Sequence, residues 1–359
     1  MTGTDLCQDQ NTETENLLMI YPEFPQEGSY VGICAPSAGV GCKLDSFDMS
    51  LEILEQTGLQ PCETESVRSE DSPSAPAEIR GQEFNELFAH EDIDMVFCAA
   101  GGDYAVEMLP FIDWELVKSN PKWFSGYSDP TAIEMLFTTV LDIATIYGVN
   151  AGAWDWRPLH EFHFNALSVI FGDMPVQHSY DMYNSKGYNE ETEEYEMDAP
   201  VEWLLFRGNP EECEMNEENE LDVTGRLIGG CIDVIDECIG TPYIDLTGFA
   251  ERYKNDGLIW FFDNFELTPM GLMYSMNRLK QMGLFDHAKA VIIGRTCFTG
   301  DASDDDYLEQ LERVFGDMDV PLIWNADIGH TRPSFTLVNG AIGHLEFEDG
   351  YAELSMELK

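Results

Sequence analysis

A serine in a tight turn is the residue of this sequence best placed to do chemistry. The segment Gly126-Tyr127-Ser128-Asp129-Pro130-Thr131 follows an apolar stretch that ends near Phe124 and precedes a helical pattern. A sharp strand-to-helix turn exposes the serine hydroxyl and leaves the next backbone N–H, that of Asp129, free to face a developing oxyanion. The segment therefore predicts a nucleophile for acyl transfer. The alternative is a structural turn in which Asp129 caps the following helix.

A serine nucleophile needs a base, and the base needs an acid that orients it. His330 lies in a glycine-flanked loop directly after the apolar stretch 321–324, which makes it the best placed of the seven histidines. Asp263 follows the apolar run 257–262, which predicts a buried strand that ends in a carboxylate. Glu266 is the second candidate for the acid. A turn-capping role for Asp263 is the structural alternative.

The elements that would position these residues follow an alternating pattern in the first half of the chain. Short apolar runs alternate with helical patterns, which predicts βαβ units around a mostly parallel sheet. Ligands of such sheets gather at the carboxyl ends of the strands, so the turns 35–39, 99–103 and 126–131 are expected to share one crevice. The expected strands are 31–34, 93–98 and 123–124, and the expected helices are 44–57, 104–112 and 131–141.

Two acidic stretches interrupt the pattern between about residues 173 and 222 and predict an inter-domain connection with a mobile loop. We expect an N-terminal α/β domain with the nucleophile at 1–175, the linker and mobile acidic loop at 176–222, and a C-terminal domain with the acid and the histidine at 223–359. Asn339-Gly340 predicts a hairpin between strands 336–338 and 341–347. The other expected strands are 203–206, 257–262, 290–293 and 321–324, with helices at 270–282 and 307–315.

Composition limits the partners and the compartment. Sixty-eight acidic residues against 18 basic ones give a net charge of −50, which repels phosphate backbones and anionic lipids and excludes nucleic acid and membrane partners. The nine cysteines contain no CxxC or Cys/His metal spacing, so we expect reduced thiols and no metal. The polar, acidic N-terminus lacks the features of a signal peptide, and no apolar stretch has the length of a membrane span. These features predict a cytoplasmic enzyme without a cofactor.

Four blocks of the sequence resemble, in the same order, the LD-carboxypeptidases and their relatives, the microcin C self-immunity hydrolases. They extend from about residue 30 to the C-terminus. The blocks are Ala35-Pro36-Ser37; Ala100-Gly101-Gly102-Asp103 through Asn120-Pro121-Lys122 to the turn of Ser128; Gly225-Arg226-Leu227-Ile228-Gly229-Gly230 with Gly240-Thr241-Pro242-Tyr243; and Gly329-His330-Thr331 with the segment that follows it.

The resemblance implies a Ser-Glu-His triad. Ser128 would be the nucleophile and His330 the general base and then the general acid. Asp263 occupies the position of the family's glutamate. The missing methylene withdraws the carboxylate by about 1.5 Å, so either the backbone compensates or the histidine is less well oriented.

The resemblance also implies the oxyanion hole, the fold and the assembly. The hole would combine the Asp129 N–H with an amide of Gly101 or Gly102, where the missing Cβ lets the backbone approach the substrate. The fold would be α/β, with an N-terminal Rossmann- or flavodoxin-like parallel sheet and a smaller, β-rich, swivelling β/α C-terminal domain. The family's homodimer is carried over as an expectation.

The expected reaction is hydrolysis of the L,D-amide bond before a C-terminal D-amino acid, as in a murein tetrapeptide, through an acyl-enzyme. One alternative is the amide of an aminoacyl nucleotide or an acyl-sulfamoyl adenylate. A second is a catalytically silent relative that binds muropeptides or other peptides. A third is an ordinary α/β-hydrolase, whose elbow has glycine where this chain has Pro130.

Several positions depart from the family pattern and bear on the substrate. Carboxypeptidases of the family often have arginine at the position of Ala100, and the usual Gly-Gly-Asn ends here in Cys231. A common His-Gly-Pro segment appears as Tyr147-Gly148-Val149-Asn150. In the immunity branch an aromatic residue of a mobile loop stacks on a nucleobase. The tyrosines in the comparable region of this chain are Tyr180, Tyr183 and Tyr188.

Overall fold

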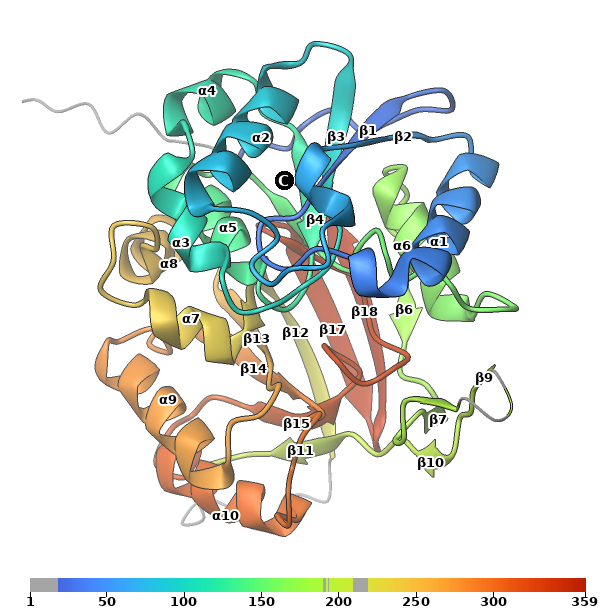
Figure 1. Ribbon diagram of the computed structural model, residues 1–359. Coiled ribbons are helices and arrows are strands. Elements are labelled where there is room, and N and C mark those ends of the chain that lie inside the picture. Colours follow the sequence, from blue (N-terminus) through green and yellow to red (C-terminus); the bar gives the residue numbers. More distant parts are fainter. Residues whose placement is uncertain (1–18, 190–191, 193, 209–218) are drawn as a thin grey trace, which may run out of the picture.

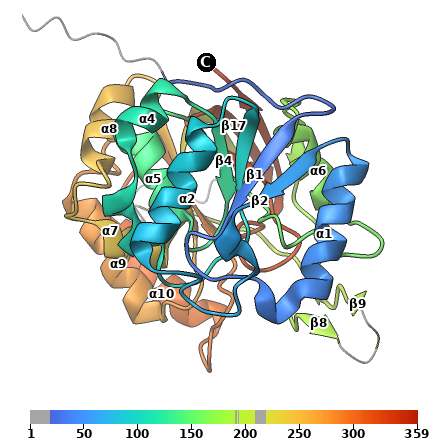
Figure 2. The same cartoon turned by 45° about the horizontal axis from the view of Figure 1, so that its top comes forward.

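Two β-sheets with helices packed around them form the centre of the molecule (Figure 1). A computed structural model describes residues 19–189, 192, 194–208 and 219–359. Helices α1 to α5 lie around the first sheet, and α7, α9 and α10 lie beside the second, as Figure 2 also shows after a 45° turn. The sequence prediction of a mixed α/β fold is confirmed.

The first sheet has six strands in the order β16-β5-β4-β3-β1-β2. Strands β1 to β5 pair in parallel, as the alternation of apolar runs and helical patterns predicts, and β16 joins antiparallel to β5. Strand β16 comes from the last part of the chain, so the C-terminal half completes the N-terminal sheet. The strands are β1 Tyr30–Cys34, β2 Gln60–Glu63, β3 Ile93–Cys98, β4 Trp123–Gly126, β5 Thr145–Tyr147 and β16 Leu337–Asn339.

The helices of the first half begin near the expected positions, but the sequence pattern missed α2. Its buried face includes Arg80 and Glu83, so polar side chains interrupt the apolar periodicity. The α-helices are α1 Leu44–Gln56, α2 Ala77–Ala89, α3 Ala105–Met108, α4 Trp114–Ser119, α5 Thr131–Met135 and α6 Glu161–Ile170. Short turns of other helix types are η1 Gly41–Lys43, η2 Glu65–Arg68, η3 Leu109–Phe111 and the π-helical η4 Leu136–Val140.

The second sheet has eight strands in the order β11-β15-β14-β13-β12-β17-β18-β6. Its centre is parallel, and β11, β17, β18 and β6 add antiparallel pairs. The strands are β6 Gln177–His178, β11 Leu204–Phe206, β12 Glu220–Cys231, β13 Leu258–Asp263, β14 Ala288–Gly294, β15 Leu322–Ala326, β17 Ile342–Glu348 and β18 Tyr351–Glu357. The helices are α7 Ile232–Cys238, α8 Leu246–Tyr253, α9 Pro269–Gln281 and α10 Asp304–Phe315.

The segment expected as a linker contributes strands to this architecture. Strands β6 and β11 both belong to the second sheet. The rest of the described segment forms two small antiparallel pairs, and part of the acidic stretch lies outside the described residues. The pairs are β7 Met182–Tyr183 with β10 Ala199–Pro200, and β8 Tyr188–Asn189 with β9 Glu194–Tyr195.

The hairpin predicted at Asn339-Gly340 is wrong. The strand before it, β16, pairs with β5 in the first sheet, whereas β17 pairs with β12 and β18 in the second. A two-residue I′ turn needs positive φ at both central residues, and here only Gly340 has it. The closing hairpin lies at Asp349 and Gly350, whose φ angles are 48° and 90°. Asn339 instead binds the Gly229 amide through its side chain and fixes the crossing between the sheets.

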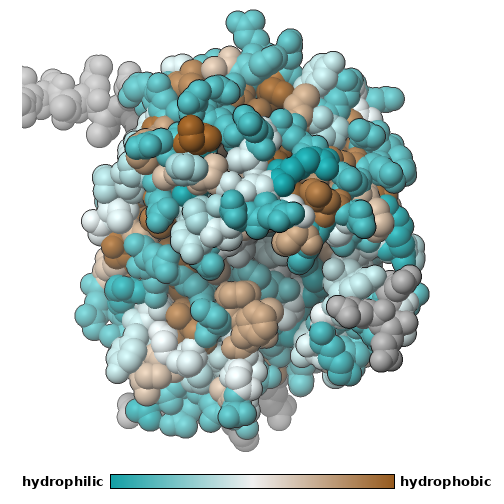
Figure 3. Space-filling view, in the orientation of Figure 1, coloured by the Kyte–Doolittle hydropathy of each residue, from teal (hydrophilic) through white to brown (hydrophobic). Residues whose placement is uncertain are grey.

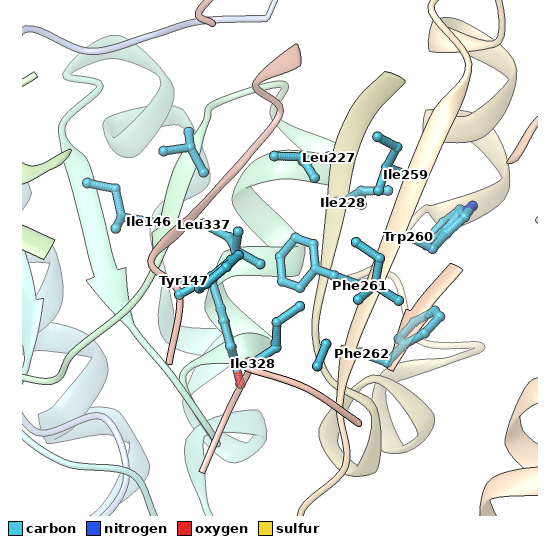
Figure 4. Close-up of a cluster of buried hydrophobic side chains, with 14 of the residues drawn as sticks. Ile146, Tyr147, Leu227, Ile228, Ile259, Trp260, Phe261, Phe262, Ile328 and Leu337 are labelled. Atoms are coloured by element: carbon cyan, nitrogen blue, oxygen red, sulfur yellow. The ribbon is translucent and has the colours of Figure 1, made fainter. Parts of the chain in front are cut away.

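One apolar core connects the two sheets. Figure 4 shows Tyr147 of β5 among Leu337 of β16, Phe261 of β13 and Ile328, all of them buried. The ring of Tyr147 lies in the core while its oxygen points to one end of the cluster (Figure 4). The sheets are therefore fixed against each other beside the residues that the sequence singles out.

The surface is mostly hydrophilic on the face drawn in Figure 3, with apolar side chains in small groups. None of the helices formed by the described residues is both long enough and apolar enough to span a membrane.

Candidate active site

Ser128 lies in a strained turn between β4 and α5. Its φ angle is 74°, a left-handed conformation that costs a non-glycine residue about 1–3 kcal/mol. The turn is held from the side by Asn150, whose Oδ1 accepts the Tyr127 N–H at 3.1 Å and whose amide nitrogen donates to the Tyr127 carbonyl. Strain of this kind is typical of a side chain that must point out of a sheet to react.

His330 reaches Ser128 because its loop, residues 327–336, connects the two sheets. The loop leaves β15 in the second sheet and ends at β16, which pairs with β5, the neighbour of β4. Asp327 anchors it: the carboxylate accepts the Tyr180 N–H and the Trp203 Nε1–H, each at 3.0 Å, and pairs with Arg295. The position of the histidine therefore depends on strand order rather than on nearness in sequence.

Ser128, His330 and Asp263 form a continuous line of contacts. The Nε2 atom of His330 lies 2.9 Å from Ser128 Oγ, and its Nδ1 atom lies 2.7 Å from Oδ2 of Asp263. The second contact is close but is not aligned as a hydrogen bond. Tyr147 donates its hydroxyl to the same Oδ2 atom at 2.5 Å. Asp263 is fully buried at the end of β13, so the histidine and the tyrosine fix its carboxylate from two sides.

Glu266, the second candidate for the acid, does not contact His330. It is exposed, and its backbone N–H donates to the Asp233 carboxylate at 3.2 Å. The neighbouring Phe265 amide binds the same carboxylate, so Asp233 caps the turn that follows β13.

The backbone at Gly329 lies close to the carboxylate of Asp263. Gly329 has φ +100°, and a Cβ on it would lie 2.0 Å from Asp263 Oδ1. Only glycine therefore lets the histidine loop approach this carboxylate so closely.

We expect Gly329→Ala to lower kcat/KM about 100-fold or more, because a 1 Å misplacement of a catalytic group can cost that much. The measurement is steady-state hydrolysis together with a thermal unfolding curve. Gly28→Ala is the matched control, since Gly28 also has positive φ but has nothing within 4 Å of its would-be Cβ. Equal activity of the two variants would contradict the close approach.

The turn that holds Gly101 and Gly102 faces the serine. A Cβ on Gly101 would lie 3.1 Å from Ser128 Oγ, whereas one on Gly102 would strike Ser37. Within the described part of the chain, the amides of Gly101, Gly102 and Asp129 donate no hydrogen bond. These amides are available to a substrate oxygen. The Ala38 N–H donates to the Gly101 carbonyl, so the expected meeting of the three strand-end turns is found.

The Asp129 side chain holds a neighbouring helix rather than its own. Its Oδ2 atom accepts the Tyr104 and Ala105 N–H groups at 2.8 Å each, at the start of α3. Burial raises the pKa of Asp129 above its ordinary value, while Ser37 and the two amides act in the opposite direction. The carboxylate thus ties the serine turn to the glycine turn, and the Asp129 backbone N–H stays free.

Glu134 is a fully buried carboxyl on α5, the helix that follows Ser128. Neither of its oxygens makes a hydrogen bond within the described residues. Burial raises the pKa of Glu134 well above its usual value, and the nearby Gly126 backbone offsets this only in part. Glu134 is therefore an acid that the folded protein keeps protonated to a higher pH than the unfolded chain does.

We expect Glu134→Gln to stabilise the protein at pH 8 and to have little effect at pH 4. Above the pKa of the unfolded chain, the unfolded state releases this proton while the folded state holds it, so wild-type stability falls by about 1.4 kcal/mol per pH unit up to the folded pKa. Glutamine has no proton to lose and removes that slope. Thermal melts of both proteins from pH 4 to 8 measure it, and parallel curves would show that Glu134 is ionised in the fold.

Aromatic rings surround the histidine. The Phe265 ring centroid lies 4.4 Å from that of His330, and the Tyr127 ring lies 5.1 Å away. The three tyrosines in the region comparable to the nucleobase-stacking loop of the immunity branch do not lie together. Tyr180 lies edge-on to Phe335, the Tyr183 ring lies under Arg295, and Tyr188 is exposed beside Tyr195.

Within the described ranges, one group of side chains has a spacing suitable for a metal ion, and it includes none of Ser128, His330 and Asp263. Asp222, His344 and Glu346 are neighbours on strands β12 and β17, where Asp222 is directly opposite Glu346. His344 binds Asp222 at 2.9 Å.

Two family models match the chain. The LD-carboxypeptidase N-terminal domain matches residues 31–148, and the LD-carboxypeptidase C-terminal domain matches residues 224–345. The chain belongs to the LD-carboxypeptidase family. The family predicted from the four sequence blocks is thereby confirmed, and with it a peptidase of the serine hydrolase type.

Relatives of both branches of the family are similar over most of their length. The microcin C7 self-immunity protein MccF of Escherichia coli is 26% identical, with 84% of this chain and 86% of that protein covered. The "probable murein peptide carboxypeptidase" of Bacillus subtilis is 25% identical, with 89% of each chain covered. A structure of MccF in complex with aspartyl sulfamoyl adenosine has the same fold, with a TM-score of 0.76, 20% identity, and coverage of 94% of this chain and 99% of that one.

Sequence reasoning from strand ends singled out the serine, the histidine and the aspartate, but it missed two residues that hold them. Tyr147 and Asn150 both lie in the segment that stands in place of the family's His-Gly-Pro. The difference from the family pattern at this segment was the one sequence feature that could have pointed to them. Their roles require knowing that β5 lies beside β4 and opposite β13.

Proposed function

We propose that this protein is a serine LD-carboxypeptidase in which Ser128 is the nucleophile, His330 the general base and Asp263 the orienting acid. The observation that carries the proposal is the 2.9 Å contact between Ser128 Oγ and His330 Nε2 in a strained strand-to-helix turn. A nucleophile within hydrogen-bond reach of a base, which a buried carboxylate contacts in turn, is the arrangement that acyl transfer requires.

The reaction would proceed through an acyl-enzyme. His330 Nε2 takes the Ser128 hydroxyl proton as Oγ attacks the scissile carbonyl, and the tetrahedral intermediate collapses when the imidazolium protonates the leaving amine. A water molecule then gives a proton to His330 and attacks the acyl-serine, which releases the shortened peptide and restores the serine. Asp263 contacts Nδ1 and stabilises the imidazolium in both halves of the reaction.

The oxyanion would be bound by the Asp129 N–H and by an amide of the Gly101-Gly102 turn. The support for this assignment is that these amides have no acceptor within the described chain and that a Cβ on Gly101 would lie 3.1 Å from Ser128 Oγ. Preorganised donors of this kind typically contribute about 10²–10³-fold to kcat each.

The substrate we propose is a murein tetrapeptide, cleaved at the L,D-amide bond before its terminal D-alanine. The relatives named for carboxypeptidase activity and the two matched family domains support it. The second candidate is the amide of an aminoacyl sulfamoyl adenylate. It is favoured by the similarity to MccF, which has been solved with aspartyl sulfamoyl adenosine.

The test is to incubate the protein with each substrate and to identify the products by mass spectrometry. Release of D-alanine from the tetrapeptide alone would support the carboxypeptidase. Cleavage of aspartyl sulfamoyl adenosine alone would assign the protein to the immunity activity. Turnover of neither, with Ser128 unreactive toward a fluorophosphonate, would favour a silent relative that binds its ligand without hydrolysing it.

We further propose that the enzyme acts in the cytoplasm as a homodimer. Seven cysteines of the described chain are free thiols, which suits a reducing compartment. The dimer is carried over from the family. Light scattering after size exclusion measures the mass directly, and a value of 40.5 kDa for the main species would contradict the dimer.

A further inference from the structure

We infer that Arg332 binds the free carboxylate of the substrate beside the scissile amide. This inference rests on the proposed function and adds to it the group that selects the substrate. Arg332 lies two residues after His330 in the loop between β15 and β16. It is half-buried, so the residue is held by the protein and still has some surface open to solvent.

The guanidinium lies beside the nucleophile turn. Its Nη2 atom donates to the Tyr127 hydroxyl at 2.7 Å, and Tyr127 is the residue before Ser128. The guanidinium carbon also lies 4.9 Å from the centroid of the Tyr127 ring and 5.5 Å from that of Phe162. The backbone of Arg332 is fixed separately, because its carbonyl accepts the Asn184 N–H at 2.8 Å. The charged group is therefore placed by aromatic rings on a well-anchored loop.

Among the residues that the structure describes, Arg332 differs from the other arginines because it has neither a carboxylate nor a carbonyl as partner. The chain has ten arginines, and within its described part seven of them form ion pairs with carboxylates. Two more, Arg157 and Arg207, donate to backbone carbonyls. Within the described ranges, the partners of the Arg332 guanidinium are the Tyr127 hydroxyl and the ring faces of Tyr127 and Phe162. With 68 acidic residues available in the sequence, an arginine without a carboxylate at the centre of the site points to an anion supplied from outside.

The charge of the protein makes a local cation useful for binding an anionic substrate. A net charge of −50 repels a peptide with a free carboxylate, and a local cation offsets this repulsion at the place where the carboxylate would bind. A guanidinium can hold a carboxylate through two parallel N–H···O bonds, which are stronger than its bond to a neutral phenol. A substrate carboxylate would thus displace the Tyr127 hydroxyl from Arg332.

The proposed substrate carries its carboxylate close to the scissile amide. The C-terminal carboxylate of a carboxypeptidase substrate is one residue from the scissile carbonyl, a span of about 3.5 Å. The group that binds it must therefore lie about one residue's length from Ser128. Arg332 donates to the hydroxyl of Tyr127, whose ring lies 5.1 Å from that of His330, so the guanidinium is on the side of the site where this carboxylate would be bound.

The experiment compares two murein tetrapeptides that differ only at the C-terminus, one with the free acid and one with the carboxamide. We expect the wild type to prefer the acid in kcat/KM by about 100-fold, the value of a charge-assisted pair that the amide cannot form. Arg332→Gln should lose that preference by falling about 100-fold on the acid, mainly through KM, with the amide nearly unaffected. Arg332→Lys should fall between the two, because it keeps the charge and loses the planar fork.

Two controls separate a binding role from damage to the site. Arg313→Gln removes the same charge from an exposed ion pair with Glu309 and should behave as wild type. The rate at which a fluorophosphonate labels Ser128 reports the nucleophile without a substrate carboxylate. An equal fall of Arg332→Gln on acid and amide, or a wild type without preference, would overturn the inference.

If the protein is not a carboxypeptidase, the carboxylate site is tested by binding instead of by turnover. If the wild type cleaves neither peptide, binding of the free-acid peptide to Ser128→Ala and to Ser128→Ala/Arg332→Gln is compared by calorimetry. Weaker binding by the double variant would still support the carboxylate site. Equal binding, or no binding by either, would overturn it.

Discussion

Ser128→Ala is expected to lower kcat by at least about 10⁴-fold while leaving the fold intact. The methyl group removes the atom that attacks the carbonyl, and His330 Nε2 loses its partner at 2.9 Å. Binding groups and backbone donors remain, so a residual rate of about 10³-fold over water is expected. Single-turnover assays on the tetrapeptide measure the loss.

The matched control for this variant is Ser125→Ala. Ser125 is a buried serine of β4, three residues earlier, and its side chain makes no contact with the triad among the described residues. Mass spectrometry after fluorophosphonate treatment should show one adduct in the wild type and in Ser125→Ala, and none in Ser128→Ala. An adduct that persists in Ser128→Ala would place the nucleophile elsewhere.

Asp263→Asn is expected to lower kcat by about 10⁴-fold with little change in KM. The carboxylate contacts Nδ1 of His330 and accepts the Tyr147 hydroxyl on the same oxygen. An asparagine oxygen could accept only weakly, and an asparagine NH₂ turned toward Nδ1 would favour the tautomer that cannot accept the serine proton. The measurement is the pH dependence of kcat for the variant and the wild type. A change in this profile reports how the substitution affects the histidine.

Asp263→Glu separates the charge from the geometry. It introduces the glutamate that the family resemblance implies, but Gly329 already lies close to Oδ1 and leaves little room for a longer acid. An added methylene would push the carboxylate against the histidine loop, so we expect a loss of about 10²-fold rather than a gain. A glutamate variant as active as the wild type would show that the loop moves freely to accommodate either side chain.

The sequence predicted the parallel sheet well because local patterns carry that information. Apolar runs such as Ile93–Cys98 are buried strands, and the strand ends placed Ser128 and Asp263 correctly along the chain. Strand β2 was missed because Gln60–Glu63 is short, polar and contains Pro61. A strand of this kind is missed because pairing with its neighbour, rather than its own residues, determines the structure.

The site could be predicted only in part for the same reason. A serine turn, a histidine after a strand and an aspartate at a strand end each leave a local signal. Tyr147, by contrast, looks like an ordinary core residue, and its hydroxyl matters only because β5 lies opposite β13. Arg332 likewise produces no recognisable sequence pattern, because its proposed role rests on the lack of a carboxylate partner among the described residues.

The strand β16 has a consequence for dissecting the protein. Residues 337–339 complete the first sheet, so a fragment that ends near residue 175 would expose the edge of β5 and the apolar side chains that β16 covers. The C-terminal fragment would carry β16 without its partner strand β5. The two matched family domains are therefore not two autonomous modules, and separately expressed halves should aggregate alone and recover function only when co-expressed.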